Sequence, residues 1–456
     1  MDSNIDRRSF LAQGVSLGGG SLLAGSLQAF LARPGHAKDA GYGPLAPVKD
    51  QRTGVELLAL PRGFAYWSFG EVGSPMSDGR PTPAAHDGMA AFQFEQKIHL
   101  VRNHEVRGSG IAFGPAAQTY DPRAGGGTTT IIFDPNHPSS VSSFASLSGT
   151  STNCAGGRTP RNSWLSCEET LDALDRPHGF VFEVPVDGTG VSDALPLTAL
   201  GRFVHEAVAV DPSSWNVYLT EDALPCGLYR FVPRSPGVLT SGQLQMLAIS
   251  GQPQANLSAG QIVGTVLAVS WVDIDVPVPN PVTPMTSVFA QGRAKGGAAF
   301  RRLEGACYSA GDGFIYFNST DGGEAAAGQV WALKPGRDRD DVLSLVYQSP
   351  STDVLLKPDN ITLSPGGGVL LCEDPDRVRQ AFLRGLTLDG KLYDFAANVR
   401  PGMIPGSNTP QSFDEFAGAT FTPDGKWLFV NIQTPGITFA ITGPFEKGPL
   451  SSTQAR

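Results

Sequence analysis

Side chains that can bind metal ions recur in this sequence at the ends of short apolar segments. Six segments open on a carboxylate or a thiol and close, one hairpin length later, on another polar or acidic residue. The opening residues are Asp87, Cys154, Glu206, Glu304, Asp359 and Glu415. Carboxylate oxygens bind hard cations such as Ca²⁺, whereas a thiolate prefers transition metals. The pattern therefore predicts a shared site for hard cations, with a softer metal at Cys154.

Each of these segments has the composition of an antiparallel β-hairpin. A turn follows the first short strand, as in residues 211–214, 364–367 and 422–425, where Pro fixes φ and, in two of the three, Gly supplies a positive φ. The second strand is rich in aromatic and β-branched residues, as in 217–219 and 369–371. Because the two strands are antiparallel, the opening and closing groups must lie at the same end of the hairpin.

Six such hairpins need a common arrangement that buries their faces. Radial stacking around an axis does this and leaves only short, protected edges. The openings recur at intervals of roughly 50 to 100 residues, and a four-stranded blade takes about 40–50. The sequence therefore predicts an all-β fold, a six-bladed β-propeller with a metal cluster at one mouth of its central channel. The interval 222–304 contains the Pro-rich segment 276–281, which we expect to be an insertion.

The polar groups at that mouth are the candidate metal ligands. They are Cys154, Glu168, Glu169, Glu206, Glu304, Asp359, Asn360 and Glu415, with Asp87, Glu105 and His205 expected beside them. The sequence leaves open which of Glu168 and Glu169 faces the metals. Two simpler alternatives also stay open: the acids as ordinary turn residues, and a disulfide between Cys154 and Cys167 across the hairpin.

Basic residues near these acids predict an anionic substrate. Arg302 lies two residues before Glu304, and Lys357 stands in the same relation to Asp359, which places each pair on one face of a strand. Guanidinium groups match phosphate bidentately, and metal ions withdraw charge from ester oxygens. We therefore expect small-molecule phosphate esters as substrates. Arg302 is the expected catalytic and substrate-binding residue, and Lys357 and Arg158 are further substrate-binding candidates.

The N-terminus has the features of an export signal. The segment Arg7–Leu11 contains a pair of arginines, an apolar uncharged run continues to about Leu31, and Gly35–Ala37 is a small-residue cleavage site. We expect residues 1–37 to be a twin-arginine signal peptide and residues 38–456 to form a single β-propeller domain. The expected location is periplasmic or secreted. No later segment approaches the ~20 apolar residues that span a bilayer, so no stable membrane span is expected after processing.

Composition agrees with an all-β chain. The 456 residues include 55 Gly and 36 Pro, and 17% of them are charged, which fits many short strands joined by turns. The formal net charge is −9, and no basic stripe is visible, so nucleic acid is not an expected partner. We expect a monomer.

These motifs, taken together, resemble the PhoX family of bacterial alkaline phosphatases. The resemblance rests on the twin-arginine start, residues 86–89, 103–105, 154–157, 167–169, 205–206, 302–305, 358–360 and 415–418. The motifs follow one another in family order over nearly the whole chain after residue 37. The resemblance implies a six-bladed propeller with a mixed iron and calcium cluster, Fe³⁺ and Ca²⁺, that hydrolyses phosphomonoesters.

The resemblance also implies roles for individual residues. Cys154, Glu206 and Glu304 would hold iron; Glu168 or Glu169, Asp359, Asn360 and Glu415 would hold calcium or bridge the metals; and Arg302 would hold the phosphate. A family lysine shortly before the cysteine has no counterpart, because serines occupy that region from 142 to 148. This departure keeps two alternatives open: a phosphodiesterase or lactonase-type hydrolase on the same propeller, and a non-catalytic binding module stabilised by metals.

Overall fold

Antiparallel sheets make up nearly all of the regular structure. The computed structural model describes residues 35–36, 41–186, 190–336, 340–375, 379–387, 389–400 and 414–451. The all-β prediction is confirmed, since the described elements are strands apart from one short α-helix and three 3-10 turns. The predicted signal peptide lies outside the described residues, except for the short strand β1 (Gly35–His36).

The six predicted hairpins are all present among the described strands. They are β5 (His86–Phe94) with β6 (Lys97–His104), β9 (Asn153–Arg158) with β10 (Ser163–Glu168), β12 (His205–Val210) with β13 (Val217–Glu221), β17 (Leu303–Tyr308) with β18 (Ile315–Ser319), β21 (Pro358–Leu363) with β22 (Val369–Glu373), and β25 (Phe416–Phe421) with β26 (Trp427–Ile432). Each pair is antiparallel. The turn residues that the sequence places between the strands therefore do what their chemistry predicts.

Further strands extend each hairpin outwards. They are β7 (Gly126–Phe133) and β8 (Val141–Thr150), β11 (Val181–Pro185), β14 (Leu228–Pro233) and β15 (Gly242–Ile249), β19 (Gln329–Lys334) and β20 (Asp341–Gln348), β23 (Phe382–Leu386) and β24 (Lys391–Asn398), and β27 (Ile437–Thr442). The last unit takes its outer strand from the other end of the chain, because β27 pairs with β4 (Ala65–Phe69). Strands β2 (Leu45–Lys49) and β3 (Glu56–Pro61) continue the β24 sheet.

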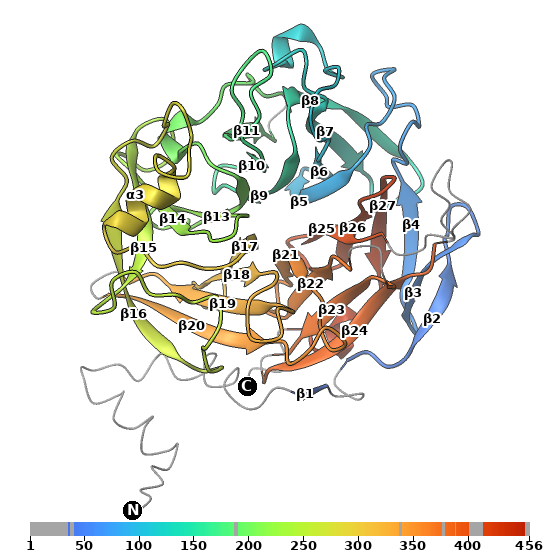
Figure 1. The fold of residues 1–456 in the computed structure, drawn as a ribbon. Coiled ribbons are helices and arrows are strands. Elements are labelled where there is room, and N and C mark those ends of the chain that lie inside the picture. The colour runs from blue at the N-terminus through green and yellow to red at the C-terminus, as the bar shows by residue number, and fades with distance from the viewer. Residues whose placement is uncertain are drawn as a thin grey trace, which may run out of the picture.

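The first strand of each hairpin lies at the centre of the molecule. In the order β5, β9, β12, β17, β21, β25, each of these strands contacts the next, and β25 contacts β5, so they form a closed ring. Figure 1 shows them around the centre, with the later strands of each sheet farther out. The strands approach so closely that a Cβ added at Gly157 would lie 2.0 Å from the Val208 carbonyl oxygen. Only glycine fits at this position, because a side chain would collide with the neighbouring strand.

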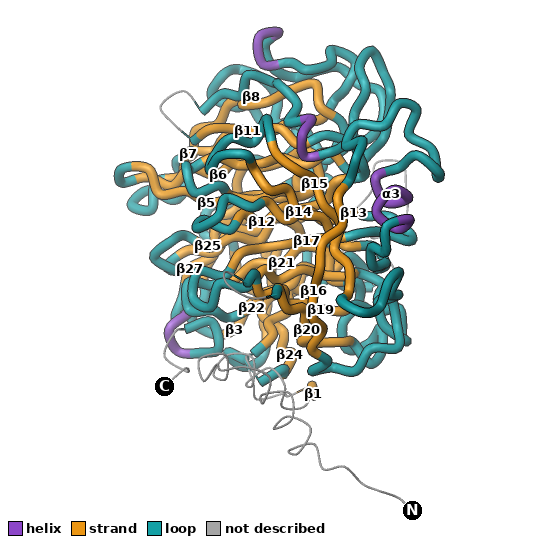
Figure 2. The backbone as a smooth tube through the Cα atoms, turned by 90° about the vertical axis from the view of Figure 1, so that its left-hand side faces the viewer, coloured by secondary structure: helices purple, strands orange, loops and turns teal. Residues whose placement is uncertain are grey.

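One additional strand joins two neighbouring sheets at their outer edges. β16 (Val266–Asp273) pairs with β15 on one side and with β20 on the other, which makes a single nine-stranded sheet. It comes from the interval in which the sequence predicts an insertion. The same interval contains the helix α3 (Val288–Ala294), which lies at the periphery (Figure 2). None of the helices in the described chain is long and apolar enough to cross a membrane.

Apolar side chains fill the spaces between adjacent sheets. Phe317, Trp331 and Leu333, for example, are fully buried in one of these layers. Complete burial of a large apolar side chain contributes roughly 1.5–3 kcal/mol. The apolar layers thus hold the sheets in place, and the polar ends of the innermost strands are left to form a site.

Candidate metal centre

A β-bulge occurs near the start of all six first strands. The ladder register shifts between His86 and Met89, Asn153 and Gly156, His205 and Val208, Leu303 and Ala306, Pro358 and Ile361, and Ala417 and Thr420. A bulge adds a residue to one strand and re-aims the side chains beside it. The repeated bulge therefore explains how the opening residues of separate hairpins are directed to one place.

The opening and closing residues of the hairpins line a common polar cavity of about 330 Å³. Its lining residues are Glu105, Arg107, Cys154, Glu169, Arg302, Glu304, Asp359, Asp374, Asp414, Glu415, Gln433 and Thr434. Glu206 is buried and lies next to this set, since the Cys154 Sγ is 3.2 Å from its Oε1. Five of the six opening residues are thus in the cavity or in contact with it. Asp87 is buried beside it and accepts a hydrogen bond from Gln433 Nε2 at 3.1 Å.

Two groups of potential ligand atoms stand out within this cluster. Glu105, Cys154 and Glu169 each offer an atom within 4.8 Å of the others, and so do Glu206, Glu304 and Asp359. The first group combines oxygen with sulfur, whereas the second contains oxygen only. Donor sets of these two kinds favour a transition metal and a hard cation respectively.

The cluster holds several buried carboxylates close together, so its ionised form needs compensating positive charge. Burial, together with the neighbouring Asp87 carboxylate, raises the pKa of Glu105 to about 8. Burial, with Asp374 close by, raises the pKa of Asp359 to about 7. Burial also raises the pKa of the Cys154 thiol, and the surrounding carboxylates add to this shift. Buried charges need partners or metal ions. The donor set therefore fits bound cations.

Unpartnered atoms support the same fit. Asp87 Oδ1 and Glu206 Oε2 are buried side-chain oxygens with no hydrogen-bond partner among the described residues. A buried acceptor without a donor costs about 1–3 kcal/mol. Metal ions bound in the cluster would satisfy such oxygens.

Arg302 is located where the sequence places it, at the edge of the acidic cavity. Its Nε and Nη2 donate to the two carboxylate oxygens of Asp222 at 2.9 and 3.0 Å, and its Nη2 lies 2.9 Å from Glu304 Oε1. The side chain is 31% exposed. A guanidinium fixed in this way presents its remaining N–H groups at a defined place beside the ligands.

The structure settles which of two adjacent glutamates faces the cavity. Glu169 lines it. Glu168 points the other way: it accepts hydrogen bonds from the backbone N–H groups of Ser151, Gly179 and Phe180, and its Oε1 lies 2.6 Å from His178 Nδ1. With these partners, the Glu168 carboxylate has no oxygen left for a metal. A ligand role for Glu168 is therefore not supported.

Two other hairpin ends also have two adjacent acids that point in opposite directions. Glu221 accepts from Tyr229 Oη and Gly227 N, and Glu373 accepts from Arg384 Nε and Leu356 N. In each case the acid that follows, Asp222 or Asp374, lies at the cluster. Successive side chains of a strand point in opposite directions. The first acid of each pair therefore holds the hairpin end together, and the second faces the centre.

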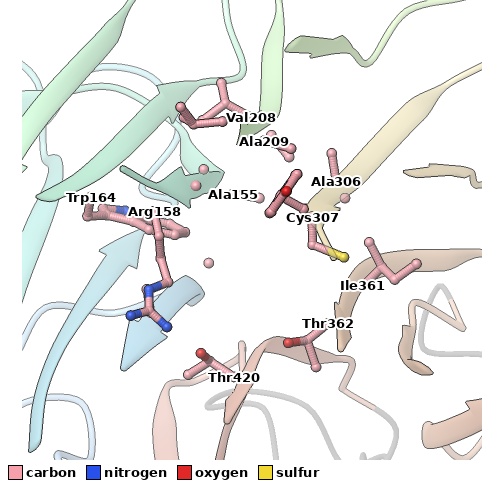
Figure 3. A pocket seen from close by; sticks show the side chains of 18 of the residues that line it. Ala155, Arg158, Trp164, Val208, Ala209, Ala306, Cys307, Ile361, Thr362 and Thr420 are labelled. Atoms are coloured by element: carbon pink, nitrogen blue, oxygen red, sulfur yellow. The ribbon is translucent and has the colours of Figure 1, made fainter. Parts of the chain in front are cut away.

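Arg158 lies in a different cavity from the acids. It is at the far end of β9 and helps to line a second cavity of about 370 Å³, whose lining contains no carboxylate among the described residues. Figure 3 shows it there near Trp164, among mainly apolar side chains. Its guanidinium lies over the Phe92 ring, 4.7 Å from the centroid. The structure thus does not bring Arg158 to the candidate substrate site.

Asn360 is also directed away from the acidic cavity. It lines the second cavity, its Oδ1 accepts a hydrogen bond from the Gly418 backbone N–H, and its Nδ2 donates to Asp359 Oδ1 at 2.7 Å. The Asn360 amide oxygen, which the sequence predicts to bind a metal, therefore makes a hydrogen bond that joins two hairpins. Asn360 instead orients the Asp359 carboxylate.

Two further candidates lie near the cavity without lining it. Lys357 is half-buried. It stands two residues before Asp359, as Arg302 does before Glu304, and both residues have a left-handed backbone conformation, with φ of 45° and 43° respectively. His205 is buried against Phe203, with ring centroids 3.6 Å apart, and its Nε2 is 3.1 Å from the Gly201 carbonyl oxygen. Burial lowers the pKa of His205 to about 3, so the ring is neutral. His205 supports the strand that carries Glu206.

All five cysteines are free thiols, including Cys154 and Cys167. The disulfide alternative is therefore excluded in this structure. Cys167 is fully buried in an apolar layer, whereas Cys154 lines the acidic cavity. The two cysteines of this hairpin thus differ in their surroundings as the ligand hypothesis requires.

Sequence reasoning missed several residues of the site, among them Arg107, Asp222 and Gln433. Arg107 follows the first hairpin and makes ion pairs with Glu105 and with Glu169, the latter at 3.3 Å. Asp222 fixes Arg302, and Gln433 donates to both Asp87 and Glu105. Asp222 and Gln433 stand at hairpin ends, so the repeat itself points to them. Arg107 lies outside the repeat, and only its closeness to Glu105 in the sequence marks it.

The fold and the site together define a propeller-like all-β protein with a metal-competent acidic centre. The family model described as "Alkaline phosphatase PhoX" matches residues 40–140 and 126–436. This is most of the chain, and the chain belongs to the PhoX family of alkaline phosphatases, which are phosphoric monoester hydrolases.

Comparison with solved structures shows a similar fold. PhoX of Pseudomonas fluorescens, in complex with vanadate, a transition state analogue, is similar over 90% of this chain and 98% of that chain, with a TM-score of 0.64 and 16% identity. A gluconolactonase of Xanthomonas campestris covers 88% of this chain and 98% of its own, but its TM-score is only 0.40 at 11% identity. A search of the curated proteins found no match.

Proposed function

We propose that this protein is an exported, metal-dependent phosphomonoesterase whose six hairpin units are the blades of a six-bladed β-propeller. The observation that carries the proposal is the acidic cavity, in which buried carboxylates, one thiol and the Arg302 guanidinium converge from separate hairpins. The family membership supports the reaction class, and the small-molecule phosphate ester is the substrate class that it implies. The protein acts as a monomer in this proposal.

The proposed cofactors are iron and calcium. The resemblance implies Glu206 and Glu304 as partners of Cys154, but the geometry favours a different set: Cys154 with Glu105 and Glu169 would hold the thiophilic metal, because their ligand atoms lie within 4.8 Å of one another. Glu206, Glu304 and Asp359 would hold a hard cation, and Glu415 would add a further oxygen. When bound, such ions withdraw charge from phosphate oxygens and make an oxygen nucleophile available at neutral pH.

The protein's own residues bind and orient the ester. A phosphate dianion cannot approach the carboxylates of the cavity unless cations neutralise them. Arg302, held by Asp222 and Glu304, then donates N–H groups to the phosphoryl oxygens, where negative charge develops in the transition state. Asp222 positions this guanidinium before the substrate arrives.

Release of phosphate from an aryl phosphate by the metal-loaded protein at alkaline pH tests the activity. Replacement of Arg302 by Ala should lower kcat/KM about 100-fold or more, which is typical for the loss of one such donor. Arg301 is the matched control, since it pairs with Asp321 at 2.9 Å and does not line the cavity. Arg301→Ala should keep activity near that of the wild type. No phosphate release from metal-replete wild type would contradict the proposal.

Elemental analysis of the natively produced protein tests the metal assignment. Cys154→Ser should lose iron but keep calcium, because the oxygen-only group is unchanged. Cys307→Ser is the control, since Cys307 is a half-buried free thiol in the other cavity. Equal iron content in wild type and Cys154→Ser would overturn the iron site at Cys154.

The export step is a separate part of the proposal. It rests on the paired Arg7 and Arg8 ahead of the apolar run. Conversion of both residues to Lys should retain the protein in the cytoplasm of a bacterial host, as cell fractionation would detect. Normal export of the double variant would contradict a twin-arginine route.

A further inference from the structure

The acidic cavity has a second basic side chain, Arg107, to which no role has been given so far. Among the described residues that line the cavity, Arg107 and Arg302 are the only basic ones, against seven carboxylates. Arg107 follows β6, which belongs to the first hairpin, whereas Arg302 precedes β17 in the fourth. The two guanidinium groups therefore come from separate parts of the ring.

The closed ring places the hairpins from which these two arginines come on opposite sides. In the order β5, β9, β12, β17, β21, β25, the β5–β6 hairpin and β17 are separated by two strands in either direction. Figure 1 shows β5 and β17 on opposite sides of the centre. Arg302 and Arg107 thus start from opposite parts of the ring, and they reach the cavity beside two neighbouring hairpin ends, where Arg107 pairs with Glu169 and Arg302 with Asp222.

The contacts of Arg107 leave most of its guanidinium accessible. Its ion pairs with Glu105 and Glu169 are both made by Nη2, and the side chain is 67% exposed. Arg302, by contrast, uses Nε and Nη2 and is 31% exposed. Glu105 and Glu169 belong to the sulfur-containing ligand group. A metal ion bound there would compete for these carboxylates and release Nη2 as well.

We propose that Arg107 is a second substrate-binding residue, which contacts the phosphate of the ester from a different part of the cavity rim than Arg302. A dianionic phosphoryl group has enough oxygens to accept hydrogen bonds from both guanidinium groups. Arg107 then supplies binding energy and orientation in the cavity. The inference rests on the proposed function, because it assumes that a phosphate ester binds in this cavity.

Inorganic phosphate is the probe for this inference. Its Kd for the metal-loaded protein is measured by calorimetry, and its Ki is measured against an aryl phosphate. Arg107→Ala should weaken phosphate binding about tenfold and raise KM to a similar extent, with a smaller effect on kcat. Arg107→Lys, which keeps the charge but not the planar fork, should give an intermediate Kd.

Arg123→Ala is the matched control. Arg123 is 61% exposed and makes one ion pair, 3.2 Å from Asp175, away from the cavity lining. This variant should leave Kd, Ki and KM unchanged. Metal content is measured for every variant, because an arginine that only organises the acids would change metal occupancy instead of phosphate affinity.

Two results would overturn the inference. One is an unchanged Kd and KM in Arg107→Ala at full metal occupancy. The other is a weaker Kd that disappears when the values are normalised to bound metal. Both leave the phosphatase proposal intact, since the wild type still binds phosphate and releases it from the ester. If the metal-loaded wild type does neither, the proposed function itself fails.

Discussion

Glu168 and Glu169 are neighbours in the chain, yet they stand in opposite environments. Glu168 is fully buried and bound by three backbone N–H groups and His178, whereas Glu169 faces other carboxylates. Burial and the adjacent Glu105 raise the pKa of Glu169. One glutamate therefore stabilises the fold, and the other is a buried carboxylate whose ionised form needs positive charge beside it.

Exchange of each glutamate for glutamine should separate these roles. Glu168→Gln should lower the free energy of unfolding by about 2–3 kcal/mol, because it replaces a charged acceptor in a buried network. Glu169→Gln should leave the metal-free protein at least as stable as wild type, but it should reduce bound metal. Urea denaturation and elemental analysis of both variants make the comparison. Equal metal loss in the two would contradict the assignment.

The raised pKa values predict how pH affects the metal-free protein. Above pH 7 the buried His86, His104 and His205 are neutral in the folded state, because burial lowers their pKa, and mostly neutral in the unfolded state, because the pH exceeds their ordinary pKa of 6.5. Glu105, with a pKa of about 8, still holds a proton in the folded state that the unfolded chain, with an ordinary pKa of 4.5, has released. The folded state then binds more protons, so stability falls as pH rises.

Thermal unfolding of the metal-free protein between pH 7 and 9 measures this effect. The Tm should decrease across the range, and saturating Ca²⁺ should reduce the decrease, since a cation replaces the protons. A Tm that is constant or increases with pH in the metal-free protein would show that the carboxylates are not buried together as described.

Sequence information alone was enough to locate the acids but not to orient all of them. The hairpin ends identify Cys154, Glu304 and Asp359 because these residues repeat in register. Arg158 was misplaced because it lies four residues beyond Cys154 on one strand, which is about 13 Å at the usual rise. Asn360 was misread because its amide oxygen is taken by Gly418 of the next hairpin, a contact that local sequence does not reveal.

At the scale of elements, glycine decides how near the central strands can come. Gly157 in β9 lies against β12, and an added Cβ would be 2.0 Å from the Val208 carbonyl oxygen. At this distance the backbone itself must shift. The turns and strand pairs could be predicted from local composition, but this spacing depends on contacts between hairpins that are far apart in the chain.

Gly157→Ala should therefore destabilise the ring by about 1–3 kcal/mol, as overpacking does in a close-packed core. It should also weaken metal binding, because β9 carries Cys154. Gly311→Ala is the control, since no atom lies within 4 Å of an added Cβ at that position. Chemical denaturation and metal content are the measurements. Equal stability of the two variants would mean that the strands can separate without cost.

At the scale of the whole molecule, the two ends of the described chain meet in one sheet. β4 pairs with β27, from Ala65–Thr442 to Phe69–Thr438, and Trp67 packs on Trp427 with ring centroids 5.5 Å apart. An early segment thus closes the sheet that the last hairpin begins. The sequence repeat predicts the units but not this closure, because β4 stands outside the repeat.

Removal of residues 1–69 should therefore abolish cooperative unfolding, since the last sheet loses its outer strand and β27 is left with an unpaired edge. Removal of residues 1–34 alone should leave Tm unchanged, because they belong to the proposed signal peptide, which is cleaved from the exported protein. Differential scanning calorimetry compares the two truncations. A single sharp transition in the longer truncation would contradict a closing role for β4.

The strand β16 affects which parts of the molecule should unfold locally as one unit. It pairs with β15 and β20, so the sheets that carry Glu206 and Glu304 share one continuous hydrogen-bond network. Their amides should exchange with deuterated solvent as a single cooperative unit, slower than those of sheets without such a strand. Asp222 and Arg302 join the same two sheets at the cavity. Fluctuations that admit or release a ligand should then arise among the sheets that β16 does not join, which include the β5–β6 hairpin that Arg107 follows.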